Sequence, residues 1–308
     1  MGTLNLLLLL LAAAVLLSLA SGWTFRRVLV AVTPAGRTHL VRGMPVTAAF
    51  GLLVILLYML VAIFAPLLAP FAEREVVGAA YLPWKAPYHL GTDNLGRDVL
   101  SRLIFGARNT IGIAFVTTML AFLLGAGTGL WAAVAGGWVD QVLSRVVDAL
   151  MAIPALIFAL LLLTIFGTGI LQLILVMAVI DATRVFRLSR AVAEGIVVMD
   201  FVEAARLRGE GAWRLVTREI LPNAMAPLVA EFGLRFCFVF LAVAALSFLG
   251  LGIQPPTADW GSMVKESATL ITFGDVTPLV PAGAIALLAV AVNFVVDWQL
   301  HRASGLKD

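Results

Sequence analysis

The stretch 109–134 reads NTIGIAFVTTMLAFLLGAGTGLWAAV and contains no Asp, Glu, Lys or Arg. A helix that crosses the hydrocarbon core of a membrane needs about 20 consecutive, mostly apolar residues. Inside lipid there is no water to bond the peptide groups, so a crossing segment must pair its N–H and C=O groups internally. The stretch therefore predicts a membrane-spanning α-helix.

Apolar runs on both sides of this stretch predict further helices of the same kind. They occupy residues 4–20, 47–69, 142–166, 170–188, 225–250 and 279–297. Together they predict an all-α, polytopic membrane protein with seven spans, or with six spans and a removable N-terminal segment. A retained helix within residues 1–22 is favoured, because MGTLN lacks the positive charge of a signal peptide. The alternative is a cleaved signal peptide ending at Ser18-Leu19-Ala20.

The composition of the 308-residue chain agrees with a membrane protein, since 62% of its residues are apolar and 13% are charged. Soluble domains have about 45–50% apolar and about 25% charged residues. The polar residues are too few to cover a water-soluble globule, which argues against a soluble enzyme or a nucleic-acid-binding protein. The single cysteine, Cys237, excludes an intramolecular disulfide.

Positive charges in short loops predict which side of the membrane each loop occupies. The segment 23–46 has no acid and carries Arg26, Arg27, Arg37 and Arg42. We therefore expect this segment in the cytoplasm, which places loop 70–108 outside, loop 189–224 inside and loop 251–278 outside. Loop 70–108 also carries basic residues, so the charge rule supports this orientation only in part. The expected segments are 1–22, 23–46, 47–69, 70–108, 109–298 and a cytoplasmic tail, 299–308.

The loop 189–224 contains signals for a short helix. Asp200 is predicted to cap a helix that begins at Phe201, with Glu203 completing a capping box. Gly209 and Gly211 are predicted to end this helix after about two turns.

A second helix is predicted from Ala212 to Leu221, ending before Pro222. By pattern alone this loop is either an ordinary surface loop or a short helix that inserts into a groove on a partner protein.

Several positions of this loop resemble the EAA loop of bacterial ATP-binding-cassette importer permeases. They are Glu203-Ala204-Ala205, Gly209 and Leu221-Pro222. In that family the loop forms a coupling helix that docks on the ATPase subunit. The resemblance implies that the coupling residues here are Asp200, Glu203, Ala204, Ala205, Gly209, Leu221 and Pro222. Glu219 departs from the family pattern, which has an apolar residue there.

Three further stretches resemble the C-type permeases of the dipeptide, oligopeptide and nickel importers. The first is HLGTDNLGRDVLSR at 89–102. The second contains Asp140, Arg145, Asp148 and Pro154. The third contains LSFLGLG at 246–252, QPP at 254–256 and Asp259-Trp260-Gly261. The extracytoplasmic motif implied by this resemblance is Gly91, Thr92, Asp93, Gly96, Arg97, Asp98, Asp259 and Trp260. The resemblance covers about residues 45–298, although Val243 and the stretch 296–301 depart from it.

The resemblance implies a six-helix permease core of the type I importer class, with residues 1–22 as an additional helix. It implies an inner-membrane subunit that imports peptides together with a second homologous permease. Two ATPase subunits would hold ATP and Mg²⁺, and an extracytoplasmic solute-binding protein would deliver the substrate. It leaves open the import of nickel chelates or glutathione. A rival outside the family is a self-sufficient secondary transporter or channel, which would usually show internal repeats.

Charged residues within the expected spans are costly and usually face a partner or a cavity. Glu231 and Arg235 lie four residues apart, so they share a helix face and can pair. Asp148 can likewise pair with Arg145. The candidates for a translocation path are Glu231, Arg235, Asp148 and Asp181, and the alternative is that such residues form structural pairs.

Other intramembrane features are predicted to be mainly structural. A lipid-headgroup or solvent-facing role is favoured for the arginines that follow Asp181, which are Arg184, Arg187 and Arg190. Pro154 and Pro227 are expected to bend their spans. Close helix packing is expected at Gly125, Gly127 and Gly129.

The chain has no phosphate-binding GxxxxGK[ST] loop and no recognisable nucleophile motif. Its histidines, His39, His89 and His301, lack metal-ligand spacing. We therefore expect no catalysis, no metal, no cofactor and no nucleic-acid partner for this polypeptide, and membrane lipid around it.

Overall fold

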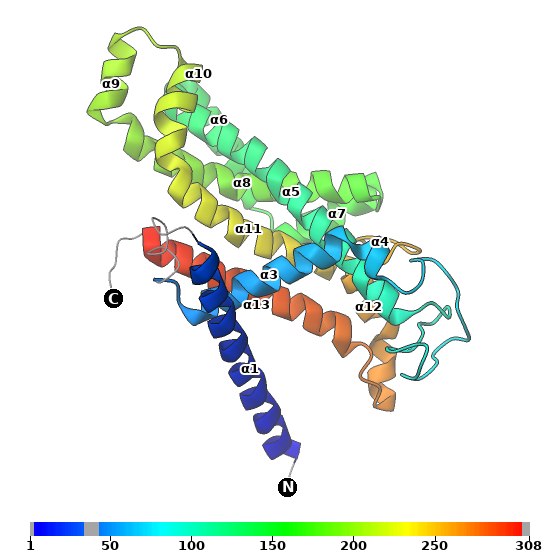
Figure 1. The fold of residues 1–308 in the computed structure, drawn as a ribbon. Coiled ribbons are helices and arrows are strands. Elements are labelled where there is room, and N and C mark those ends of the chain that lie inside the picture. Colours follow the sequence, from blue (N-terminus) through cyan, green and yellow to red (C-terminus); the bar gives the residue numbers. More distant parts are fainter. Residues whose placement is uncertain (1–2, 34–42, 304–308) are drawn as a thin grey trace. The chain divides into compact units, whose positions relative to one another are not determined.

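The computed structural model describes residues 3–33 and 43–303 (Figure 1). In this part of the chain the regular elements are helices, and the β-type pairings are isolated bridges such as Val76 with Arg97. The all-α prediction is therefore confirmed. Arg37 and Arg42 of the predicted basic segment lie outside the described residues.

The helices follow the apolar runs closely. They are α1 (Thr3–Val32), α3 (Val46–Ile63), α4 (Ala65–Leu68), α5 (Val99–Ala135), α6 (Gly137–Met151), α7 (Ala155–Phe166), α8 (Ile170–Val197), α9 (Asp200–Leu207), α10 (Ala212–Arg214), η2 (Leu215–Ile220), α11 (Leu221–Leu249), α12 (Trp260–Ser267), η3 (Ala268–Phe273) and α13 (Leu279–Ala303). The helices α12 and η3 lie in the segment 251–278, which the apolar pattern had predicted only as a loop.

Five helices of the described residues are long and apolar enough to cross a membrane, or up to six if α6 and α7 count as one. Helix α8, at the predicted span 170–188, is not among them, because it carries Asp181, Arg184 and Arg187 within its apolar stretch. Its 28 residues are nevertheless long enough to cross a membrane.

The predicted span 142–166 is not one continuous helix, because α6 and α7 form an angle of 88°. The break lies at 152–154 and ends with Pro154 as the N-cap of α7. Proline has no N–H to donate, and it disfavours helical backbone at the residue before it. The bend predicted at Pro154 is thus confirmed, whereas α11 continues through Pro227.

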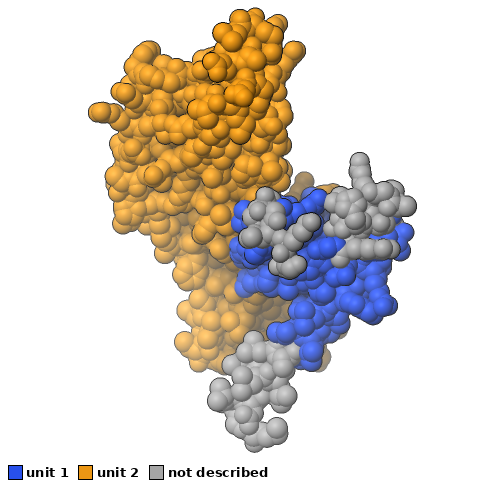
Figure 2. Space-filling view, turned by 90° about the vertical axis from the view of Figure 1, so that its left-hand side faces the viewer, with its two compact units in different colours: residues 1–60, 286–308 blue, residues 61–285 orange. Residues whose placement is uncertain are grey.

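The chain divides into two compact units, coloured separately in Figure 2. The first contains residues 1–60 and 286–308 and joins α1, most of α3 and most of α13. Two glycines permit close backbone approach here: a Cβ on Gly22 would lie 2.5 Å from the Val46 carbonyl oxygen, and one on Gly51 would lie 2.4 Å from that of Ala291. Helix α1 continues to Val32, beyond the expected boundary at residue 22.

The second unit, residues 61–285, is organised around the packing of α5 along α8. A Cβ on Gly125 would lie 2.4 Å from the Ala182 carbonyl oxygen, and one on Gly129 would lie 2.6 Å from that of Phe186. Small residues at such positions allow helix backbones to approach closely. The packing role predicted for Gly125 and Gly129 is confirmed, but Gly127 has no neighbouring atom at its Cβ position.

Candidate functional site

The short helix α9 begins one residue earlier than predicted. Its N-cap is Met199, which makes no side-chain capping bond, and Asp200 is the first helical residue. The predicted capping box of Asp200 and Glu203 is therefore wrong. Both carboxylates still lie in the first turn, where the positive end of the helix dipole favours negative charge.

The end of α9 agrees with the glycine signal. Gly209 has a φ of +80°, in the left-handed region, which only glycine adopts at no steric cost. The Gly209 N–H donates to the Arg206 carbonyl at 2.9 Å, and the Glu210 N–H donates to the Ala205 carbonyl at 3.2 Å. These bonds satisfy carbonyl groups that the helix end would leave unpaired.

The prediction that the second helix ends before Pro222 is wrong. The chain continues from α10 through the π-helix η2 into α11, and Pro222 lies in the first turn of α11. A proline in an α-helix interior removes one hydrogen bond and clashes with the carbonyl four residues earlier. The wider turns of η2 directly before Pro222 offer a way to accommodate both effects.

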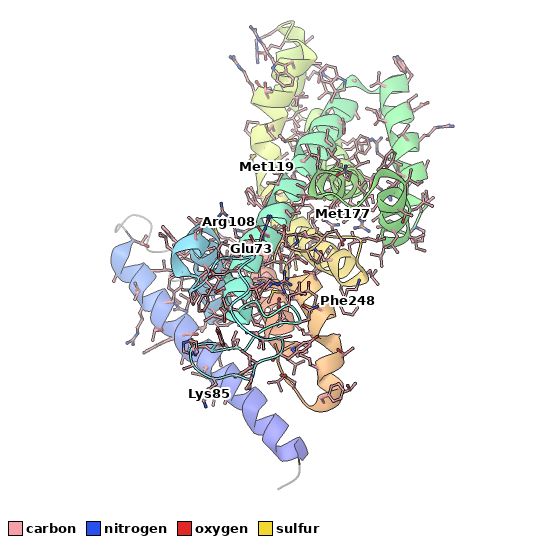
Figure 3. All side chains as sticks on the ribbon, turned by 90° about the vertical axis from the view of Figure 1, so that its right-hand side faces the viewer. Glu73, Lys85, Arg108, Met119, Met177 and Phe248 are labelled. Atoms are coloured by element: carbon pink, nitrogen blue, oxygen red, sulfur yellow. The ribbon has the colours of Figure 1, made fainter. Side chains whose placement is uncertain are left out.

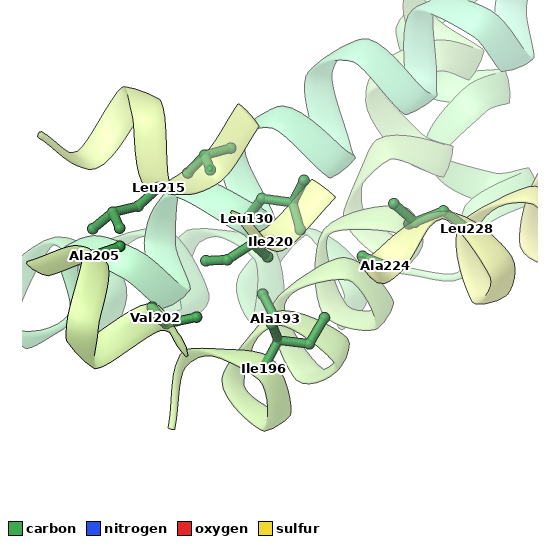
Figure 4. Close-up of a cluster of buried hydrophobic side chains, with 10 residues drawn as sticks. Leu130, Ala193, Ile196, Val202, Ala205, Leu215, Ile220, Ala224 and Leu228 are labelled. Carbon is green, nitrogen blue, oxygen red and sulfur yellow. The ribbon is translucent and has the colours of Figure 1, made fainter. Parts of the chain in front are cut away.

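One face of α9 is anchored in a hydrophobic cluster (Figure 4). Val202 and Ala205 are fully buried there. Their neighbours in the cluster come from α5, α8, η2 and α11: Leu130, Ala193, Ile196, Leu215, Val216, Ile220, Ala224 and Leu228. The cluster holds α9 as a fixed element of the second unit.

The opposite face of α9 is exposed in the part of the chain that the structure describes. Glu203 and Ala204 are exposed, and Leu207 is 84% exposed. Other exposed apolar side chains flank them: Val198, Met199, Phe201 and Trp213. Of the remaining predicted coupling residues, Pro222 is exposed and Leu221 is half-buried, and both lie at the start of α11. The loop thus presents a rigid helix with a mixed apolar and charged surface.

The predicted residues Asp93 and Arg97 form a buried ion-pair network with Arg102 and Glu266. Arg97 Nε lies 2.6 Å from Asp93 Oδ2, and Arg102 also pairs with that oxygen. Glu266 Oε2 lies 2.7 Å from an Arg102 nitrogen and 3.4 Å from one of Arg97. The arginine side chains are only 3% and 1% exposed. The network joins the segment before α5, α5 itself and α12.

The predicted motif residues Asp259 and Trp260 lie against α5. Asp259 Oδ1 accepts a hydrogen bond from Thr110 at 2.8 Å, and its Oδ2 accepts from the Ser262 N–H at 2.9 Å, which caps α12. Burial raises the pKa of the Asp259 carboxyl, and these hydrogen bonds oppose that shift. The Trp260 indole donates to the Leu103 carbonyl at 2.9 Å. The motifs at 91–98 and 259–261 therefore both contact the first part of α5.

The other motif residues shape the turn before α5. Gly91 and Gly96 have φ values of +73° and +75°, and a Cβ on Gly96 would lie 2.1 Å from the Gly78 carbonyl oxygen. Thr92 donates to the Ala79 carbonyl at 2.7 Å. Asp98 caps α5 by accepting the Ser101 N–H at 2.7 Å.

Glu73 was missed by sequence reasoning, although it belongs to the same region (Figure 3). Its Oε1 accepts from the Asn109 amide at 2.9 Å and from the Ala258 N–H at 2.6 Å. Nothing in the sequence pattern pairs Glu73 with residues so far along the chain. Glu266 was missed for the same reason.

Glu231 and Arg235 form the predicted pair, with Arg235 Nε 2.7 Å from Glu231 Oε1. Asp181 extends the pair into a four-residue cluster, because its Oδ1 lies 3.6 Å from Arg235 and 3.5 Å from Arg184. Asp181 is 3% exposed.

Two predictions about other charges need correction. Asp148 and Arg145 are both exposed, and no ion pair joins them among the described residues, so the predicted pair does not form. Arg190 was expected to face headgroups or solvent, but it pairs with Asp140, one contact being 2.7 Å, and with Glu194 at 2.7 Å. Arg187 is exposed, as expected.

We expect Glu231→Gln to destabilise the protein more than the double change Glu231→Gln with Arg235→Gln. The single change leaves the cluster with one uncompensated positive charge, whereas the double change leaves Asp181 and Arg184 balanced. Leaving a buried charged partner unsatisfied costs about 1–3 kcal/mol or more. Thermal unfolding of the purified protein in detergent measures the difference. Glu194→Gln serves as the matched control. The Glu194 side chain is 49% exposed and pairs with Arg190, so its replacement should change stability little.

Residues 125–303 match the family described as the binding-protein-dependent transport system inner membrane component. The dipeptide transport system permease protein DppC of Alkalihalophilus pseudofirmus is 33% identical over 262 residues, covering 85% of this chain and 84% of the relative. The di/tripeptide transport system permease protein DppC of Pseudomonas aeruginosa is 36% identical over 265 residues, covering 84% and 85%.

A further relative carries a different substrate name. The glutathione transport system permease protein GsiD of Pectobacterium atrosepticum is 30% identical over 270 residues, covering 85% of both chains. The family match exceeds half of the chain, and the relatives span most of it. This chain belongs to the family of inner membrane components of binding-protein-dependent transport systems and is a multi-pass protein of the bacterial inner membrane.

Proposed function

We propose that this chain is one permease subunit of an ATP-driven importer for short peptides. Relatives named for dipeptide and di/tripeptide transport support the substrate class. The chain pairs with a second, homologous permease, and the two enclose the translocation path. ATP and Mg²⁺ bind to two separate ATPase subunits, and an extracytoplasmic solute-binding protein delivers the peptide.

The two-sided α9 carries this proposal. Val202 and Ala205 fix the helix to the permease, while Glu203, Ala204 and Leu207 remain exposed. A helix fixed in this way moves with the permease as a rigid body when its outer face is pushed. We assign the outer face to the cytoplasmic ATPase subunit, so that closure of the ATPase dimer on ATP moves α9 and opens the path outward.

The solute-binding protein docks on the opposite side of the membrane in this proposal. The segment 70–98 and the helix α12 are held together there by the ion-pair network and by Glu73. In this proposal the buried charge pairs fix the arrangement of this surface, a role that buried polar groups have in some proteins. A fixed surface suits a partner that must bind and leave in every transport cycle.

The test is uptake into proteoliposomes that contain this chain, its partner permease and their ATPases. We expect uptake of radiolabelled dialanine only with ATP inside and the peptide-loaded binding protein outside. Collapse of the ion gradients should leave uptake unchanged, whereas a secondary transporter would lose it and would need no ATP. Preferred uptake of glutathione or a nickel chelate over dialanine would keep the importer and change its substrate.

A further inference from the structure

A cavity of about 160 Å³ lies where α7, α8 and α11 meet. Its wall includes Asp181, Arg184, Met177 (labelled in Figure 3), Phe238 and small residues such as Ala159 and Ala242. This volume holds several water molecules, so the pocket has room for one end of a short peptide.

Asp181 lies in the cavity wall with half of its carboxylate unpaired. Its Oδ1 contacts Arg184 and Arg235, whereas Oδ2 is buried and has no hydrogen-bond partner among the described residues. A buried carboxylate oxygen without a donor is unfavourable. The Asp181 carboxylate therefore keeps acceptor capacity that the described residues do not use.

Arg184 is the complementary group one helical turn away. Its side chain is 42% exposed, and its contact with Asp181 is long, at 3.5 Å. It also lines a second cavity of about 140 Å³, beside Thr183 and Pro154. Arg184 is thus loosely held, and a guanidinium binds a carboxylate well through two parallel hydrogen bonds.

The remaining members of the cluster hold Asp181 in place. Arg235 is itself fixed by Glu231 at 2.7 Å and lies over the Phe238 ring at 4.9 Å. Asp181, Arg184, Glu231 and Arg235 balance in charge. A ligand that enters with one positive and one negative end keeps this balance, whereas a singly charged ligand disturbs it.

We propose that Asp181 and Arg184 form a binding site for the two ends of a zwitterionic short peptide on its way through the permease. The α-ammonium donates to the Asp181 carboxylate, and the α-carboxylate accepts from Arg184. Residues three apart on a helix have Cβ atoms about 5–6 Å apart, so both ends of a very short peptide can reach their partners. Glu231 and Arg235 are positioning residues. This inference rests on the proposed function.

The test measures peptide binding to the permease without the solute-binding protein. The whole importer, in lipid nanodiscs, is dialysed against radiolabelled dialanine, N-acetyl-dialanine or dialanine amide. We expect free dialanine to be retained best, because the acetyl form lacks the ammonium and the amide lacks the carboxylate. Asp181→Asn should lower dialanine retention at least tenfold, and Arg184→Gln should remove the discrimination against the amide.

Ala242→Leu provides a variant that keeps all four charges and fills the cavity from α11. It should lower dialanine retention as Asp181→Asn does. Ala245→Leu is the matched control, because Ala245 is exposed on the same helix and does not line the cavity. The control should bind as the parent does.

Equal retention of dialanine and N-acetyl-dialanine by the parent would overturn the site, as would unchanged retention in Asp181→Asn and Ala242→Leu. No retention of dialanine by the parent would also overturn it. Uptake assays on the same preparations separate this result from the proposed function. ATP-driven peptide uptake with no such binding rejects only the site, and absence of any ATP-driven peptide uptake rejects the function.

Discussion

Gly209→Pro is expected to abolish ATP-driven uptake while the protein still accumulates in the membrane. Gly209 has a φ of +80° and donates its N–H to the Arg206 carbonyl at 2.9 Å. Proline fixes φ near −65° and has no N–H, so the chain cannot leave α9 along its present course. The cluster that holds Val202 and Ala205 would then no longer present α9 correctly to the ATPase.

A graded series at this position separates backbone geometry from side-chain bulk. No atom lies within 4 Å of a Cβ built on Gly209, so added bulk meets nothing. Left-handed backbone costs an ordinary residue about 1–2 kcal/mol, and asparagine tolerates it better. We expect uptake to fall in the order Asn, Ala, Pro, measured in proteoliposomes at equal amounts of assembled importer. Full uptake by Gly209→Pro would remove α9 from the coupling mechanism.

Glu203→Lys tests the same surface through charge. Glu203 is exposed in the first turn of α9, so its replacement leaves the buried cluster intact. We expect ATP hydrolysis to lose its stimulation by the peptide-loaded binding protein, because the charge offered to the ATPase is reversed. Asp297→Lys, a reversal at an exposed residue near the end of α13, is the control and should stay coupled.

The sequence predicted the helices well where apolar length alone decides them. The predicted spans 225–250 and 279–297 correspond to α11 and α13. Prediction was less exact where one local feature redirects the backbone. At Pro154, where a bend was expected, the chain turns by 88°, and at Pro222, where a helix end was expected, the π-helix η2 leads directly into α11.

The site residues that could be predicted are likewise those whose role depends on the local sequence. Gly209 was predictable, because its effect on the backbone is local. Glu266 and Glu73 were not, because their partners are distant in the chain and no spacing rule joins them. Asp181 was singled out as a charge within an apolar stretch, but its contact with Arg235 required the packing of α8 against α11.

Arg102→Met is expected to lower the free energy of unfolding by about 3–5 kcal/mol, the usual cost of breaking a buried ion pair by removing one partner. Arg102 is 1% exposed and contacts both Asp93 and Glu266. Methionine fills much of the same space, so the loss arises mainly from the two acids, which keep only Arg97 as a partner. Thermal unfolding in detergent measures the effect, and Arg108→Met at an exposed site of the same helix should change stability by less than about 0.5 kcal/mol.

Adding Glu266→Gln to Arg102→Met should recover part of the lost stability, because Asp93 and Arg97 then remain as a balanced pair at 2.6 Å. If the network mainly fixes the geometry of the docking surface, its loss should also impair function. The double variant should be stable enough to assemble and still stimulate ATP hydrolysis poorly with the loaded binding protein, since α12 is no longer tied to the segment before α5. If Arg102→Met behaves like Arg108→Met in both assays, the network neither stabilises the protein nor orders its docking surface.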